Sequence, residues 1–401
     1  MRPTVPVEGG AGATEVLHTV EHGRACEGMF SCGAPFDGRE NIALESNSIF
    51  AHYSLHVYRM PSSWILVTGA GGEMGHALIH ALSQTGAAIV ATDLRPLPDG
   101  IADSCAAVLT GPEGDVTRTE FVQSALRYPI ERIFHLAAVL STAAERDPVR
   151  AHHINVDGTL NVLELAHQLG SEHQRSIRVL FPSTIAVYGF ASLEEKMRHV
   201  QVREDQALQP QTLYGIAKLH CERLGEYYAR YYRRLSGEAP WVDFRAIRFP
   251  GLISADTLPT GGTSDYAPEM LHAAAQGQPY RCFVRPDTQI PFMAMPDGVR
   301  ALLMLADADR EQLSQHVYNI GAFAPTAADL AQTIAGYFPG ATISFDVDQR
   351  RQAIVDSWCA DVDDTAARQD WGWMPQYTYE RAFSEYLIPA IKHRYANVLA
   401  S

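Results

Sequence analysis

The sequence predicts a doubly wound α/β fold, in which a parallel sheet has helices on both faces and a smaller lobe follows towards the C-terminus. From Trp64 onward, short apolar runs alternate with longer amphipathic segments. The runs are apolar throughout instead of alternating with polar residues, which is typical of parallel strands buried on both faces. A glycine-rich turn also joins the first run to a helical segment, as at the first strand of many such sheets.

Six of these apolar runs are the expected strands of the sheet, at residues 64–68, 87–93, 105–109, 132–138, 177–183 and 241–249. Strands that alternate with helices in this order are typical of the Rossmann class. After residue 250 Pro and Gly become frequent, and we expect strands at 317–320 and 342–345 and a helix over 326–337. We therefore expect a cofactor-binding Rossmann domain over residues 60–250 and a mainly substrate-binding lobe over 251–401.

The composition favours a small-molecule ligand. The chain has 401 residues, of which 46% are hydrophobic, and a formal net charge of −14, which argues against nucleic-acid or anionic-membrane partners. No apolar stretch is long enough to span a membrane. The six cysteines form no Cys-x-x-Cys pair, so neither a disulfide framework nor a metal site is indicated, and we expect a reducing, cytoplasmic setting.

Residues 1–59 have neither an apolar signal core nor the pattern of a transit peptide. We expect this N-terminal extension to be disordered or to result from an upstream start, with Met60 as a plausible true start. The alternative is that Phe30, Phe36 and Phe50 dock it onto the main domain.

The segment TGAGGEMG, residues 68–75, predicts a dinucleotide site after the first strand. Its glycines let the backbone approach a pyrophosphate at the N-terminus of the following helix. The residues expected to contact the cofactor here are Gly69, Gly72, Glu73, Met74 and Gly75. Asp93 closes the second strand and is expected to accept hydrogen bonds from the ribose hydroxyls. Its charge would repel the extra phosphate of NADP and so favours NAD, although the nearby Arg95 could pair with that phosphate. Asp115 is expected at the adenine edge; the alternatives for these two acids are a turn residue and a loop acid.

The catalytic candidates lie in YGIAK, residues 214–218, and in PSTIAVYG, residues 182–189. Tyr214 and Lys218 are four residues apart and share one helix face. A lysine beside a phenol favours the phenolate, as a general base for an alcohol proton requires, and Lys218 can also hold the nicotinamide ribose. Ser183 and Thr184 end a strand, where their hydroxyls can orient and polarise the reacting oxygen.

Over about residues 64–395 the chain resembles the extended short-chain dehydrogenase/reductase family. The motifs that match are the glycine turn, Asp93, Thr184, Tyr214 and Lys218. Thr184 stands where the family usually has a serine. The resemblance implies an NAD-linked reaction at a carbon that bears an alcohol. It also implies a homodimer through helices at about 149–169 and 212–234. The tyrosines of the second helix, at 227, 228, 231 and 232, serve either that interface or the core.

Sugar-nucleotide members of this family carry an Asn after the sixth strand and a later Arg, both for the substrate diphosphate. This chain has FPGLIS (249–254) and QIPFMAMPD (289–297) at those places, which indicates a smaller substrate. The stretches RFPGLISADTLPTGGTSDYA (248–267), LSTAAE (140–145), RQAIVDSW (351–358) and DWGW (370–373) resemble the short-chain L-threonine 3-dehydrogenase group.

That second resemblance implies a substrate pocket formed by Ser141, Ser183, Thr184, Tyr214, Thr263 and Trp358. For Trp358 and Thr263 the alternatives are core packing and a turn cap. The implied reaction is oxidation of the β-hydroxyl of L-threonine, or of a close β-hydroxy amino acid, with NAD as the cofactor. The alternatives are a sugar-nucleotide epimerase or dehydratase that keeps its NAD bound, and a non-catalytic NAD sensor.

Overall fold

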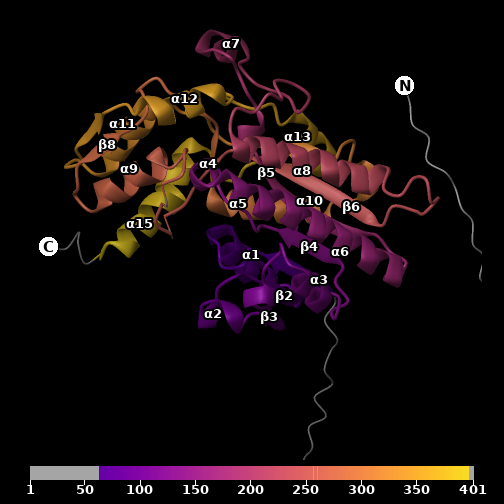
Figure 1. Ribbon diagram of the computed structural model, residues 1–401. Coiled ribbons are helices and arrows are strands. Elements are labelled where there is room, and N and C mark those ends of the chain that lie inside the picture. The colour runs from indigo at the N-terminus through magenta and orange to yellow at the C-terminus, as the bar shows by residue number, and fades with distance from the viewer. Residues whose placement is uncertain (1–62, 256, 260, 397–401) are drawn as a thin grey trace, which may run out of the picture. The chain divides into compact units, whose positions relative to one another are not determined.

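A seven-stranded parallel sheet forms the centre of the fold in the computed structural model, which describes residues 63–396 except 256 and 260 (Figure 1). Its strands run in the order β10-β6-β5-β4-β1-β2-β3. Their bounds are β1 Trp64–Thr68, β2 Ala88–Thr92, β3 Ala107–Leu109, β4 Arg132–His135, β5 Ile177–Thr184, β6 Val242–Phe249 and β10 Val317–Asn319. The predicted parallel sheet is confirmed, and the ends of each predicted strand lie within two residues of the observed ones, except that β4 ends three residues earlier than predicted. The extension predicted for residues 1–59 lies outside the described residues.

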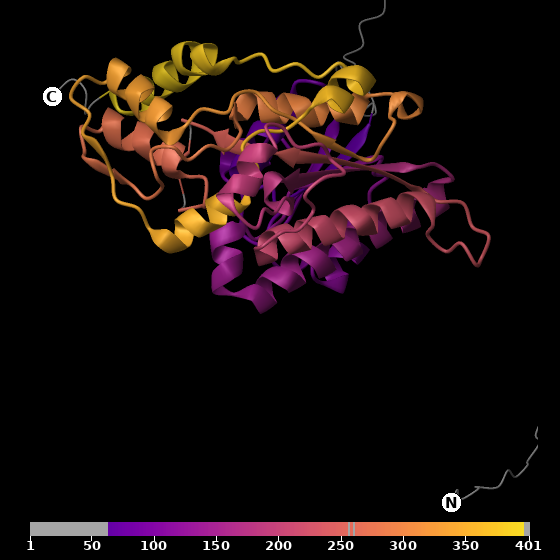
Figure 2. The same ribbon diagram turned by 90° about the horizontal axis from the view of Figure 1, so that it is seen from above.

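Helices cover both faces of the sheet. On one face lie α3 (Thr119–Ala125), α6 (Gly158–His173) and α8 (Leu213–Arg230), and on the other α1 (Glu73–Ser83), α10 (Met295–Asp307) and α13 (Thr365–Trp371). In Figure 2 the orange α10 and the pink α8 lie on opposite sides of the strands. Each face has its own hydrophobic core, so the strands are apolar on both sides, as their sequences predict.

A smaller lobe follows β6 and has a third core of its own. It contains two short strand pairs, β7 (Gly251–Ile253) with β9 (Phe292–Ala294) and β8 (Tyr280–Cys282) with β11 (Ile343–Phe345). Its helices are α9 (Tyr266–Ala275), α11 (Ala327–Tyr337), α12 (Gln349–Ser357) and α15 (Ile388–Arg394). Because α10, β10 and α13 return to the sheet layer, the second half of the chain builds both parts. The domain boundary at residue 250 stays a prediction.

Short helices connect these layers. They are α2 (Asp99–Ala102), α4 (Ser141–Arg146), α5 (Pro148–His152), α7 (Leu193–Arg198) and α14 (Tyr379–Arg381). Single π-helical turns at His153–Asp157 and Ala382–Leu387 lead into α6 and α15. Among the described residues, none of the helices is both long and apolar enough to cross a bilayer.

Helix α8 approaches the sheet closely at Gly225. A Cβ atom at this position would lie 2.3 Å from the ring of Phe244 on β6, so no larger side chain fits. The close approach matters because α8 carries the predicted catalytic pair and faces the carboxyl end of β5.

Candidate active site

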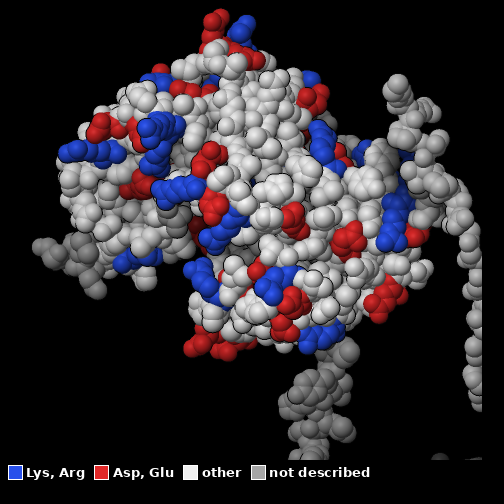
Figure 3. Space-filling model, in the orientation of Figure 1, with Lys and Arg blue, Asp and Glu red and all other residues white. Residues whose placement is uncertain are grey.

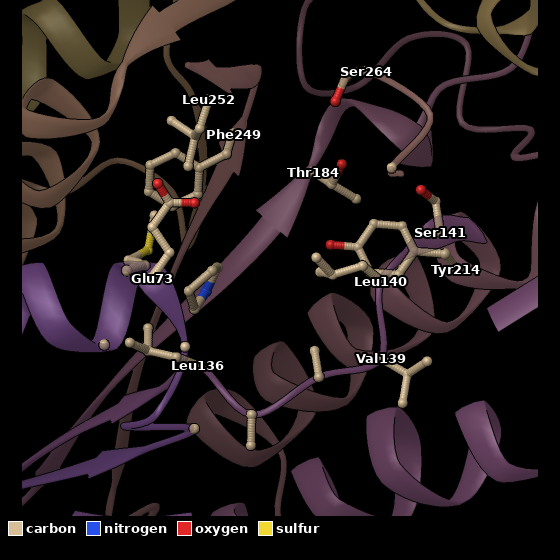
Figure 4. Close-up of a pocket in the computed structure, with 18 of the residues that line it drawn as sticks. Glu73, Leu136, Val139, Leu140, Ser141, Thr184, Tyr214, Phe249, Leu252 and Ser264 are labelled. Carbon is tan, nitrogen blue, oxygen red and sulfur yellow. The ribbon is translucent and has the colours of Figure 1, made fainter. Parts of the chain in front are cut away.

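A cavity of about 840 Å³ lies at the carboxyl ends of β1, β2, β4, β5 and β6, where open parallel sheets bind their ligands. It brings together all the residues that the sequence singled out: Gly69, Gly72, Glu73, Met74, Gly75, Asp93, Asp115, Ser141, Ser183, Thr184, Tyr214, Lys218, Thr263 and Trp358. Figure 4 shows Thr184, Tyr214, Ser141 and Ser264 grouped at one end, and Glu73, Phe249 and Leu252 at the other. The individual roles of these residues stay predictions.

The glycine turn between β1 and α1 leaves room only for backbone. Gly69 has a φ of +67°, and a Cβ atom on it would lie 2.6 Å from the backbone nitrogen of Ala137. A Cβ atom on Gly75 would likewise lie 2.6 Å from the carbonyl oxygen of Ala70. Gly72 is the N-cap of α1 and offers no side-chain cap to the first helical N–H groups, which suits a bound phosphate.

Two acidic residues of the cavity, Asp93 and Asp115, come after the strands β2 and β3. The Asp93 carboxylate accepts hydrogen bonds from the backbone N–H of Gly71 at 2.9 Å and of Arg95 at 3.1 Å, which holds it against the glycine turn. Asp115 uses one oxygen within its own loop, where it accepts from the N–H and hydroxyl of Thr117 at 3.0 and 2.7 Å. Glu73 adds a buried carboxylate oxygen that has no hydrogen-bond partner in the described protein. A glycine turn, a bare helix N-terminus and Asp93 together fit a dinucleotide.

Replacing Asp93 with serine is expected to raise KM for NAD by about ten- to a hundredfold, because each lost charge-assisted hydrogen bond to the ribose is worth about 1.5–3 kcal/mol. Discrimination against NADP should fall as well, since the repelling carboxylate is gone. Initial rates with NAD and NADP check this, with Asp103→Ser at an exposed acid as the control. An unchanged NAD-to-NADP ratio would remove Asp93 from cofactor selection.

The N-cap of α8 sets the position of the catalytic pair. Thr212 caps the helix by accepting from the N–H of Gly215 at 3.1 Å, and the first turn then faces the end of β5. Lys218 Nζ donates to the carbonyl oxygen of Pro182 at 2.7 Å, and lies 4.3 Å from the ring centroid of Phe181 but 5.8 Å from that of Tyr214. The ammonium is therefore held by β5, beside the phenol but not against it.

The sequence predicted a lowered pKa for Tyr214, and in this structure that prediction is wrong. Burial of the phenol raises its pKa, and the neighbouring Thr184 hydroxyl opposes the rise only in part. The expected effect of Lys218 is missing because its ammonium bonds the β5 carbonyl instead. Burial also lowers the pKa of Lys218 itself, to about 8.

The lowered pKa of Lys218 predicts a pH-dependent stability. Between about pH 8 and its ordinary value of 10.5, the unfolded chain holds a proton that the folded chain has lost, so the free energy of unfolding rises with pH. Below that window the folded protein bears the full cost of a buried ammonium. From pH 7.5 to 9.5 the free energy of unfolding of the parent should therefore rise relative to that of Lys218→Met, as measured by urea unfolding. The exposed Lys392→Met on α15 is the control, and a constant difference would contradict the prediction.

The two hydroxyls at the end of β5 differ. Thr184 accepts from the N–H of Ala186 at 3.1 Å, lines the cavity and has its hydroxyl beside the Tyr214 phenol. Ser183 is 3% exposed and donates to Glu222 Oε1 at 2.5 Å. The sequence reasoning missed Glu222 and its partner Arg248, although Glu222 stands one helical turn after Lys218, and Arg248 is a charge within an apolar strand.

The expected substrate end brings together residues far apart in the sequence. Ser141 Oγ lies 3.1 Å from Thr263 Oγ1, and both residues are buried. Trp358 follows α12; it belongs to the core of the lobe and also lines the cavity, so its packing role and a ligand role coexist. Its indole N–H is buried without a hydrogen-bond partner in the described protein. Arg351, which the sequence analysis also missed, donates to the carbonyl oxygen of Gly262 at 2.8 Å and so holds the turn before Thr263.

Known proteins similar to this chain identify its family. Residues 65–321 match the NAD dependent epimerase/dehydratase family. This chain belongs to that family. The resemblance to extended short-chain dehydrogenases/reductases is thereby confirmed, and the cofactor of the family is NAD.

Relatives of the chain include L-threonine dehydrogenases as well as epimerase/dehydratases. The chain is 35% identical over 314 residues to the mitochondrial L-threonine 3-dehydrogenase of Bos taurus, which covers 77% of this chain and 78% of the relative. Among solved structures, the L-threonine dehydrogenase of Clostridium difficile is 30% identical, with a TM-score of 0.72 over 83% of this chain and 98% of that one. A monomeric L-threonine 3-dehydrogenase from a metagenome is 32% identical, with a TM-score of 0.70 over 82% and 99%.

Proposed function

We propose that this protein oxidises the β-hydroxyl of L-threonine, or of a close β-hydroxy amino acid, to the 2-amino-3-oxo acid with NAD. The observation that carries the proposal is the hydroxyl-rich end of the cavity, where Ser141, Thr184, Tyr214 and Thr263 share one space with the glycine turn. The L-threonine dehydrogenase relatives support the same substrate class.

The proposed roles follow from the geometry. NAD, which the glycine turn and Asp93 would hold, would supply the hydride acceptor for the β-carbon. Tyr214 takes the proton of the substrate hydroxyl, while the Thr184 hydroxyl donates a hydrogen bond to that oxygen. Lys218 Nζ is held by the carbonyl oxygen of Pro182, 5.8 Å from the ring centroid of Tyr214, and its proposed role is to hold the nicotinamide ribose. Since burial raises the pKa of Tyr214, the phenol is protonated at neutral pH, and oxidation should speed up as the pH rises.

The remaining hydroxyls suit a small zwitterion. Ser141 and Thr263 can rotate to donate to a carboxylate, and Trp358 closes the cavity on the side of the lobe. For L-threonine the product would be 2-amino-3-oxobutanoate: one hydride leaves the β-carbon and one proton leaves its oxygen.

Appearance of NADH tests the proposal. Purified protein is mixed with excess NAD and, separately, with L-threonine, L-serine or UDP-glucose. Reduction with L-threonine, faster at pH 9 than at pH 7, supports the proposal. Isomerisation of UDP-glucose with no net reduction would replace it by the epimerase function that the family name also covers.

We further propose a homodimer through α6 and α8. Apolar side chains are exposed on this side of the molecule at Val149, Leu160, Ile216, Tyr227 and Tyr231. Figure 3 shows largely uncharged surface over the first turns of α8. The other two tyrosines pack inside: Tyr228 is buried, and the Tyr232 hydroxyl donates to Glu164 at 2.6 Å. One solved relative is described as monomeric, so sedimentation velocity of this protein is the deciding measurement.

A cytoplasmic setting is the corresponding proposal for location. It is supported by the free thiols of all four cysteines in the described part of the chain, at 105, 221, 282 and 359.

A further inference from the structure

A charged group lies buried directly behind the catalytic cavity. Ser183 on β5 and Arg248 on β6 are register partners in the parallel sheet, so their side chains lie next to each other on one face. Glu222 of α8 covers that face and bridges them. Glu222 is 0% exposed, Arg248 1% and Ser183 3%, and Ser183 is the member that lines the cavity.

The carboxylate of Glu222 is fully engaged. Arg248 Nε donates to Oε1 at 2.9 Å and Arg248 Nη2 to Oε2 at 2.6 Å, in a bidentate pair. The second hydrogen bond to Oε1 comes from the Ser183 hydroxyl at 2.5 Å. An ionised carboxylate only accepts hydrogen bonds, so the proton of this bond belongs to Ser183.

Further hydrogen bonds of Arg248, on the side away from Glu222, hold its guanidinium group in this orientation. Its Nη1 donates to the hydroxyl of Tyr188 at 3.0 Å and to the carbonyl oxygen of Glu204 at 2.8 Å. The Tyr188 hydroxyl in turn donates to Asn319 Oδ1 at 2.6 Å. With all three guanidinium nitrogens bonded, Arg248 stays charged and in place opposite Glu222.

The consequence reaches the cavity through Ser183. A serine hydroxyl has one proton and two lone pairs, and here the proton points away from the cavity, towards Glu222. Ser183 can therefore only accept a hydrogen bond from a ligand. It cannot donate to the substrate carboxylate or to the reacting oxygen, which leaves those groups to Ser141, Thr263 and Thr184.

We propose that Ser183 accepts a hydrogen bond from the substrate ammonium and that Glu222, held by Arg248, is the positioning residue that makes it an acceptor. The ammonium is the substrate group that only donates. This inference rests on the proposed function and deepens it, because it names the contact that selects an amino acid over the hydroxy acid of the same skeleton. The carboxamide of the cofactor is the rival donor.

The test compares L-threonine with 3-hydroxybutanoate, which lacks the amino group, in the parent and in Ser183→Ala. Loss of a hydrogen bond to a charged group should lower kcat/KM for L-threonine by about ten- to a hundredfold. The value for 3-hydroxybutanoate should change less than threefold, and the Kd for NAD, from titration calorimetry, should stay the same. Ser264→Ala removes another serine hydroxyl of the same cavity and should leave the ratio of the two substrates unchanged.

A second variant examines the positioning role. In Glu222→Gln the amide can donate to Ser183 and turn its proton towards the cavity, so L-threonine should again lose more than 3-hydroxybutanoate does. Circular dichroism checks that this variant folds, and Ser183→Ala keeps the buried pair intact in case it does not. An equal loss for both substrates, or a loss that falls on the Kd for NAD, would overturn the assignment of Ser183. Absence of parent turnover with L-threonine would instead refute the proposed function.

Discussion

Replacing Tyr214 with phenylalanine is expected to lower kcat for L-threonine by about 10²–10⁴-fold, the range that a positioned general base contributes. The ring stays, and with it the packing against the core of the lobe, but no atom remains to take the hydroxyl proton. NAD binding should persist, because the glycine turn and Asp93 are untouched. Stopped-flow or steady-state NADH formation gives kcat, and protein fluorescence gives the Kd for NAD.

Tyr227→Phe is the matched control for this experiment. It removes one phenol oxygen from the same helix at an exposed position, and should leave kcat within about twofold. If Tyr214→Phe retained parent activity, the proton would have to leave by another route, and Thr184 would be the next group to test.

Truncating Arg248 to alanine is expected to cost about 3–5 kcal/mol of unfolding free energy, because it leaves the Glu222 charge buried without its partner. Both members of the pair are almost completely shielded from water. Urea unfolding followed by circular dichroism measures the loss. Replacing both members with apolar residues of similar volume should restore much of it, because no uncompensated charge then remains.

Arg118→Ala is the matched control for the buried pair. Arg118 pairs with Glu120 at 2.9 Å, but the two side chains are 50% and 46% exposed. Loss of such a surface pair is expected to cost less than about 1 kcal/mol. Equal effects of Arg248→Ala and Arg118→Ala would show that burial of the Glu222 pair has no energetic weight.

The sheet and the cofactor turn were predictable because their signals are local. Continuous apolar runs report burial on both faces, and Gly69 and Gly75 are required by contacts within the turn and with the adjacent strand. Helix α8 was predicted to run to about residue 234 and ends at Arg230, a difference of a single turn.

Which side chains of the site donate hydrogen bonds and which accept them could not be predicted in the same way. Whether Ser183 donates or accepts depends on the register between β5 and β6 and on which face of α8 covers them. Lys218 was expected against the phenol, yet a backbone carbonyl of β5 captures its ammonium. Helix spacing places two residues on one face, but the hydrogen bonds between elements decide what each side chain does there.

The two ends of the cavity have different origins along the chain. Apart from Lys218, the groups expected to hold the cofactor come from one continuous stretch, from Gly69 to Asp115, whereas the opposite end is assembled from segments between Ser141 and Trp358. Mutations that reshape the second set leave the first intact. The substrate specificity of such an enzyme could therefore change in evolution while its cofactor site stays the same. A mutant library confined to the loops around Ser141, Thr263 and Trp358 should yield new substrate preferences with unchanged use of NAD.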